Sequence, residues 1–202
     1  DSNFISTFLA NSFQNKSALM VLVINQPESF EDENKQRDLH NALNALGVIE
    51  WQQKHLSLLS FLNTDNKILI IDRYSSIKIP DKFGVGLARK IGADIALALH
   101  ELGAIQSDWI CSTDADATLP ISYFSSVSNL HHSNMAACFN FSHYCENEEV
   151  NQANALYERA LRYYVAGLEY AGSSYAFYTI GSTLAFNAAA YANVRGFPKR
   201  SA

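Results

Sequence analysis

The chain has 202 residues, of which 48% are hydrophobic and 17% charged, and its formal net charge is −5. This length suits one sizeable α/β domain, and this composition can fill a core, which excludes a disordered chain and a coiled-coil protein. A net negative charge without a basic patch excludes general binding to nucleic acids.

The cysteine content and the apolar stretches indicate the compartment. Cys111, Cys138 and Cys145 form no CxxC pair, and an odd number of cysteines argues against a disulfide framework. The longest uncharged stretch, residues 170–194, is interrupted by glycine, serine, threonine and asparagine, whose polar groups are costly in lipid. We therefore expect a cytoplasmic protein and no membrane span in this chain.

Apolar runs rich in β-branched residues alternate with segments of helical period along the first half of the chain. This alternation is typical of strands joined by crossover helices in a parallel sheet. The predicted elements are a strand at 18–24, helices at 39–46 and 51–63, a strand at 67–71 and a helix at 84–103.

The second half continues the alternation, with Pro120 in the first turn of a short helix and Asn187 capping another. Its other predicted elements are strands at 108–113, 136–143 and 176–186, and a helix at 152–171. No linker or internal repeat divides the chain. The sequence thus predicts a single α/β domain, residues 1–202, with a mostly parallel central sheet flanked by helices on both faces.

Polar side chains follow the first three predicted strands. Asn25 begins a turn that runs to Glu28, Asp72 ends the second strand, and Asp114 and Asp116 follow the third. In an open parallel sheet the ligand crevice lies at the carboxyl ends of the strands, so we expect these residues to surround one site.

Asp114 and Asp116 are candidate metal ligands. Two carboxylates about 4 Å apart at a buried strand end repel by roughly 4 kcal/mol at an intermediate dielectric constant, and a divalent cation removes that repulsion. Oxygen ligands suit Mg²⁺ or Mn²⁺, and Mg²⁺ is commonly shared between carboxylates and substrate phosphates. A hydrated turn after a strand is the alternative explanation for this Asp-x-Asp pair.

Arg89 is a candidate ligand for a diphosphate. We expect it in the first turn of the glycine-led helix, where a cation is unfavourable by itself and a bound anion would reverse the balance. Backbone N–H groups after Gly84 and Gly86 would add further donors. A surface cation paired with Asp81 or Asp94 is the alternative.

Five segments follow one another along the chain: INQPE, IIDRYSS, GVGLARKIGADIAL, WICSTDADATLP and YTIGSTLAFNAAAYANVRGFPKR. Over residues 18–200 they resemble the nucleotide-sugar half of the family-2 glycosyltransferases, which have the GT-A fold. The resemblance implies this fold, transfer of a sugar from a nucleoside-diphosphate-sugar donor to an unidentified acceptor hydroxyl, and Mn²⁺ or Mg²⁺ as cofactor. It divides the chain into a nucleotide-binding half, 18–118, and a donor-sugar and acceptor half, 119–202, that is incomplete at its C-terminal end.

The resemblance also implies roles for single residues in the nucleotide-binding half. Asn25, Glu28 and Asp72 match the elements that hold the nucleobase and the ribose. Arg89 matches the arginine that contacts the diphosphate.

Further roles concern the metal and the transferred sugar. Asp114 matches the carboxylate near ribose and metal, and Asp116 matches the direct metal ligand. Gly181 and Ser182 match a segment that borders the donor sugar and the acceptor. The carboxylate that serves as general base follows the Gly-Phe-Pro segment in this family, so we expect it beyond Ala202.

Two other functions remain open at this point. One is a non-catalytic module that binds nucleotide sugars without transferring them. The other is a sugar-phosphate nucleotidyltransferase, which would carry a glycine-rich loop directly after the first strand. The residues between Ile24 and Gly47 contain no glycine.

Overall fold

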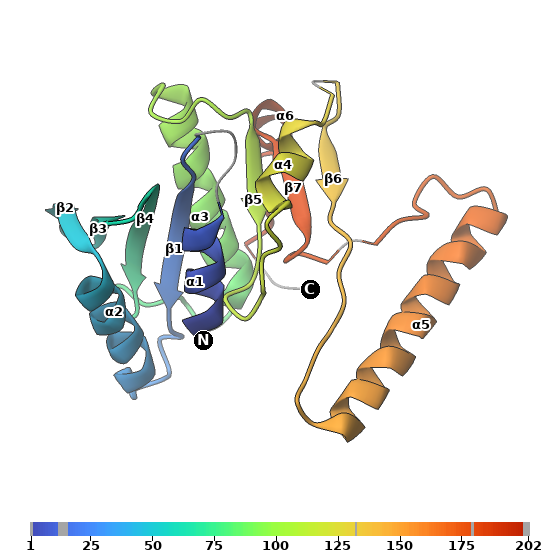
Figure 1. Cartoon of the computed structure of the whole chain (residues 1–202), viewed down its shortest axis with the longest axis horizontal. Coiled ribbons are helices and arrows are strands. Elements are labelled where there is room, and N and C mark those ends of the chain that lie inside the picture. Colours follow the sequence, from blue (N-terminus) through green and yellow to red (C-terminus); the bar gives the residue numbers. More distant parts are fainter. Residues whose placement is uncertain (1, 12–15, 132, 179, 200–202) are drawn as a thin grey trace.

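The computed structural model describes residues 2–11, 16–131, 133–178 and 180–199 (Figure 1). Its helices are α1 (Ser2–Ala10), α2 (Asn34–Leu46), α3 (Gly84–Glu101), α4 (Tyr123–Ser128), α5 (Glu148–Tyr170) and α6 (Ala188–Asn193). Its strands are β1 (Leu19–Asn25), β2 (Val48–Gln53), β3 (Leu56–Phe61), β4 (Thr64–Arg73), β5 (Trp109–Ser112), β6 (Ala136–Cys138) and β7 (Leu184–Asn187).

The strands form two separate sheets. The first has the order β1-β4-β3-β2, in which β1 and β4 are parallel and the other pairs are antiparallel. The second has the order β5-β7-β6 and is antiparallel throughout. β1 and β5 each have a partner on one side only among the described residues, so the two sheets do not join there.

The expected GT-A fold, with one mostly parallel central sheet, is therefore wrong. The chain is a mixed α/β protein with a mostly antiparallel four-stranded sheet and a separate three-stranded antiparallel sheet. The error has a physical cause, because any strand covered on both faces presents a continuous apolar run, whichever way its neighbours point. Residues 68–71 of β4 are buried throughout, although their neighbour β3 is antiparallel.

Residues 51–63, expected as a helix, lie mostly in a β-hairpin. β2 and β3 pair around a turn at Lys54, whose φ of 53° lies in the left-handed region. Ser57 and Leu59 are buried on one face of β3, while the alternate residues are half-buried. The leucine-rich run fits a period of two as well as a helical period, so pairing with β4 decides its structure.

Other predicted elements are confirmed with shifted ends. The helices expected at 39–46 and 84–103 correspond to α2 and α3, and the strand expected at 176–186 shrinks to β7. Asn187 caps α6 as predicted, because its side chain accepts hydrogen bonds from the backbone N–H groups of Ala189 and Ala190. α1 was not predicted.

Helices cover both faces of the first sheet. Ile24 of β1 is buried in the main core cluster, to which α1 contributes Phe4 and Phe8, and α2 contributes Leu43. Successive residues of a strand face opposite ways, and the neighbouring Val23 lies against α3, where a Cβ on Gly92 would be 3.4 Å from its Cγ2 atom. α3 also packs against β5, so this one helix touches both sheets. Figure 1 shows α1 in front of the first sheet and α3 behind it.

Residues 139–178, which we call the arm, leave the second sheet after β6 and return towards β7. The arm contains α5, the longest helix of the described chain, and none of the residues of α5 is buried. In Figure 1 α5 stands apart from the rest of the molecule, which we call the body.

Candidate functional site

Arg89 and Asp114 form an ion pair where α3 meets the loop after β5. The Nη2 atom of Arg89 lies 2.6 Å from Oδ1 of Asp114, and the two side chains are 28% and 45% exposed. Partly exposed pairs of this kind contribute roughly 0.2–1 kcal/mol to stability. A ligand can therefore replace either partner at a small cost in free energy.

Arg89 lies in the second turn of α3 rather than in the first, because the helix begins at Gly84. Its Nε–H group is buried and has no hydrogen-bond partner among the described residues. The protein thus leaves part of the guanidinium without a partner. The backbone N–H groups at the start of α3 have no side-chain cap from Phe83, the N-cap residue.

Gly181 lies directly against this arginine. A Cβ atom at position 181 would be 2.8 Å from Nη1 and 3.0 Å from Cζ of Arg89, so the absence of a side chain makes room for the guanidinium. Ser182, the next residue, is half-buried. Residues 89, 114 and 181 are distant in sequence, and the fold brings them into one corner.

A cleft of about 2010 Å³ opens beside this corner and is lined by β1, β5 and α3. Its walls along the strands are mainly apolar. Arg89, Asp114 and Asp116 line it near the end of β5, and Lys16, Asp65, Lys67 and Asp108 line it elsewhere. Asn25, the last residue of β1, also lines it, and its amide makes only a long contact of 3.5 Å with the Val23 carbonyl. The cleft exceeds the ~300–1,000 Å³ typical of small-molecule pockets, so its volume by itself selects no particular ligand.

The carboxylates fit one kind of metal site and not another. Asp116 is exposed and lines the same cleft as Asp114, one of whose oxygens accepts from Arg89. Within the described ranges, no group of three or more histidine, cysteine, aspartate or glutamate side chains could hold a metal ion. Two carboxylates are too few for a cation held by protein alone. They do suit Mg²⁺ or Mn²⁺ shared with the phosphates of a ligand.

Asp72 and Glu28 are not among the residues that line the cleft. One oxygen of Asp72 accepts from the backbone N–H groups of Tyr74 and Ser75, each at 3.0 Å, and the other accepts from the Ser75 hydroxyl. Burial raises the pKa of Asp72, but these hydrogen bonds outweigh it and leave the pKa below its usual value. Asp72 thus holds a turn, and its role towards a nucleobase stays a prediction. Glu28 is exposed, and its backbone N–H donates to the Ile79 carbonyl.

Sequence reasoning missed a second cluster on α3. The Nζ atom of Lys90 lies 3.1 Å from Oδ2 of Asp94 and donates to the Arg195 carbonyl. The Tyr191 hydroxyl donates to Asp94 at 2.8 Å. The cluster ties α3 to α6 and to the turn at Gly196, and Lys90, which is paired within it, does not line the cleft. The i, i+4 spacing of lysine and aspartate was a signal for the first of these contacts.

None of the helices in the described part of the chain has both the length and the apolar character that crossing a bilayer requires. Comparison of the chain with protein-family models, with curated proteins and with solved structures gave no significant match.

Proposed function

We propose that the protein binds a nucleoside-diphosphate sugar at the cleft corner formed by Arg89, Asp114 and Gly181 and transfers the sugar to an acceptor hydroxyl. The observation that carries the proposal is that Arg89 contacts both Asp114 and Gly181. The resemblance to the family-2 glycosyltransferases implies that each of these residues belongs to a different part of one donor: the diphosphate, the metal and ribose, and the sugar. Arg89 and Asp114 line the large cleft, and Gly181, which is not among its lining residues, packs against Arg89. This arrangement supports a common ligand.

Arg89 acts on the departing diphosphate. Its fork of N–H donors matches phosphate oxygens, and its weak pairing with Asp114 lets it turn to a ligand that arrives. A guanidinium held close to a developing negative charge stabilises the transition state electrostatically. Gly181 allows the guanidinium to keep this position.

Asp114 and Asp116 would hold the divalent cation together with the diphosphate. When bound, the cation supplies positive charge that stabilises the leaving group. Release of the Arg89 guanidinium from Asp114 frees a carboxylate oxygen for this purpose. We assign no general base within the described residues.

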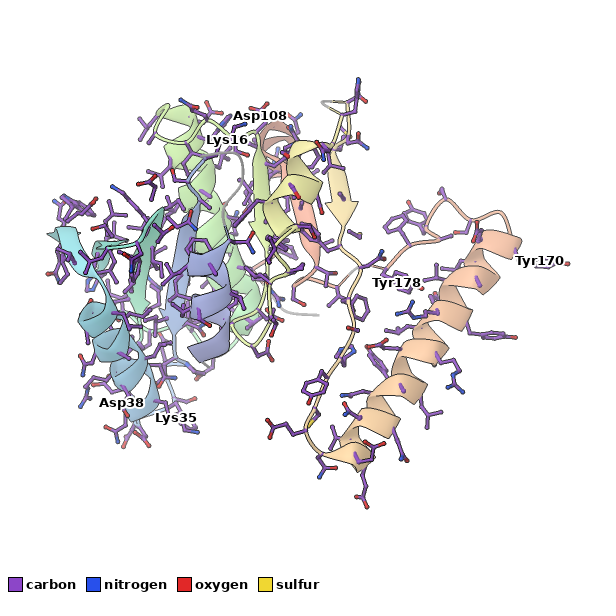
Figure 2. The ribbon with its side chains drawn as sticks, in the orientation of Figure 1. Lys16, Lys35, Asp38, Asp108, Tyr170 and Tyr178 are labelled. Carbon is purple, nitrogen blue, oxygen red and sulfur yellow. The ribbon has the colours of Figure 1, made fainter. Side chains whose placement is uncertain are left out.

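Calorimetry of the protein with Mn²⁺ and nucleoside diphosphates tests the proposal. We expect binding that depends on Mn²⁺ and weakens at least about tenfold in Asp116→Ala and in Arg89→Ala, which corresponds to roughly 1.4 kcal/mol. Asp38→Ala is the matched control, since Asp38 is exposed at the outer end of α2, away from the second sheet (Figure 2).

An affinity for nucleoside diphosphates that does not depend on Mn²⁺, or that is unchanged in Asp116→Ala, would disprove the assignment of the site. Release of nucleoside diphosphate from a nucleotide sugar in the presence of acceptor then tests transfer. Binding without release would identify a nucleotide-sugar-binding module instead.

A further inference from the structure

One face of α5 carries a seven-residue repeat. The repeat consists of large residues Val150, Tyr157 and Tyr164, small residues Ala153, Ala160 and Gly167, and flanking residues Leu156, Tyr163 and Tyr170. Seven residues bring an α-helix back to within about 20° of the same direction, so these nine positions share one face. We call them the repeat face.

The repeat face is largely open to solvent, and within it the Tyr157 ring makes an edge contact with the ring of His143. Its large side chains are between 44% exposed, at Val150, and 95% exposed, at Tyr170. Figure 2 shows Tyr170 projecting outward from the end of α5. A Cβ atom added to Gly167 would meet no atom within 4 Å.

The charged residues of α5 mostly avoid this face. Glu149 precedes Leu156 by seven positions and continues the repeat, whereas the other charged side chains lie outside it. These are Glu148, Glu158, Arg159, Arg162 and Glu169. The flank that bears Glu158 and Asn151 is partly covered by the arm itself, through contacts with His143 and Cys145. Apolar, uncharged positions at this spacing are typical of a helix that pairs with another helix.

We propose that the repeat face pairs with the same face of a second copy of this chain, with the two α5 helices antiparallel. A two-fold axis between positions 158 and 159 sets each large residue opposite a small one of the second copy. The facing pairs are Val150 with Gly167, Tyr157 with Ala160, and Tyr164 with Ala153.

This arrangement explains why large and small residues alternate. Each layer then holds one large and one small side chain, so all layers have similar volumes, as close packing requires. A parallel pair would set tyrosine against tyrosine in some layers and alanine against alanine in others. The tyrosine layers would be overcrowded and the alanine layers would leave voids, and each of these defects is destabilising. The sequence of α5 is complementary to itself only in the antiparallel sense.

The available area fits an interface between two copies. An aromatic side chain offers roughly 150–250 Å², and with the exposed fractions of the repeat face the total is on the order of 600–800 Å². A stable interface buries about 800 Å² per partner. The same contact stabilises a helix that buries no residue against the body, since most helical stability in proteins comes from the packing of an apolar face.

Sedimentation equilibrium of the full chain tests the pairing. We expect the average mass to rise from one chain towards two as the concentration increases from about 1 to 200 μM. Ala160→Glu, which sets two carboxylates near the two-fold axis, should weaken association at least about tenfold. Ala155→Glu is the matched control, since Ala155 is exposed on the same helix outside the repeat face, and it should leave association unchanged.

A mass of one chain at every concentration would overturn the proposal. So would equal effects of the two glutamate substitutions, because those would indicate a general effect of charge or helix stability.

Disulfide crosslinking tests the direction of pairing. When Ala153→Cys and Tyr164→Cys proteins are mixed and oxidised, we expect a disulfide between the two variants. Two copies of position 153 would be about 16 Å apart along the helices, which no disulfide spans. Mass spectrometry of the linked peptides separates these disulfides from those of the native cysteines. Disulfides between identical variants, without the mixed one, would overturn the antiparallel arrangement.

Discussion

The body and the arm bury their helices very differently. α3 packs against strands of both sheets and holds Ala88 and Ala93 in buried positions, whereas α5, although five residues longer, buries none. Packing against both sheets fixes the helix backbone that carries Arg89. The body therefore provides the fixed geometry that a binding site needs, whereas the arm provides exposed side chains that can contact a partner.

The two regions also use their polar contacts for different purposes. In the body, Asn66 donates hydrogen bonds to the carbonyls of Phe8 and Asn11, which fastens the end of α1 to the start of β4. In the arm, contacts such as that between His143 and Glu158 connect the arm with itself. Few contacts therefore oppose local opening of the arm, and regions of this kind open at a lower free energy than a core.

The largest expected effect comes from truncating an apolar side chain in each region. Ile68→Ala, at a position with 0% exposure in β4, should lower the free energy of unfolding by about 2–5 kcal/mol because it leaves a cavity. Leu156→Ala, at a position 63% exposed in α5, should change it by less than about 0.5 kcal/mol. Urea unfolding, measured at a concentration too low for self-association, gives both values.

Equal losses at the two positions would contradict the comparison, because they would mean that α5 is packed as tightly as β4. Leu62→Ala serves as a further control, since Leu62 is 93% exposed in the body.

Replacing a glycine by alanine should destabilise the body and stabilise the arm. A Cβ atom on Gly47 would lie 2.9 Å from the Ser60 carbonyl oxygen and 3.0 Å from a ring carbon of Phe61, so Gly47→Ala should cost about 1–3 kcal/mol. Gly167→Ala meets open space within a helix and should stabilise α5 by about 0.5–1 kcal/mol. Amide hydrogen exchange over residues 148–170 measures the second effect locally, and urea unfolding measures the first.

Faster amide exchange in α5 after Gly167→Ala would contradict this prediction. It would show that the added methyl group disrupts a contact of α5 that is absent from the structure of the single chain.

The fold could be predicted in part because local signals and tertiary pairing carry different information. The glycine-led pattern of residues 84–103 and the cap at Asn187 act within a few residues, and both predictions are confirmed. Strand direction depends on partners far along the chain: β5 pairs with β7, more than 70 residues later. Apolar runs do not encode this direction, so the prediction of a mostly parallel sheet was wrong.

The candidate site could be predicted at the level of residue types and not of contacts. The position of Asp114 after a strand and of Arg89 on a glycine-led helix suggested charge at a ligand site, and the structure joins them by an ion pair. The sequence analysis did not predict that both oxygens of Asp72 accept hydrogen bonds from Tyr74 and Ser75. Such local hydrogen bonds compete with ligands for the same carboxylate.

The smallest expected effect is a change in the pKa of one carboxylate of the body that leaves the pKa of one carboxylate of the arm unchanged. The pKa of Glu158 is lowered, chiefly by the hydrogen bonds from the backbone N–H and the ring of His143, and the pKa of Asp72 is lowered because the bonds from Ser75 and Tyr74 outweigh the effect of burial. A lowered pKa in the folded state gives stability that is present above the unfolded values, about 3.9 for Asp and 4.3 for Glu, and is lost as the pH falls through the folded values. Ser75→Ala removes a hydrogen bond to Asp72 and should raise that pKa towards its usual value without moving the pKa of Glu158. The carboxyl carbon chemical shifts, followed by NMR through the acid pH range, give the pKa values of both groups. If Ser75→Ala changed both pKa values, the arm and the body would be coupled more closely than their separate contacts indicate.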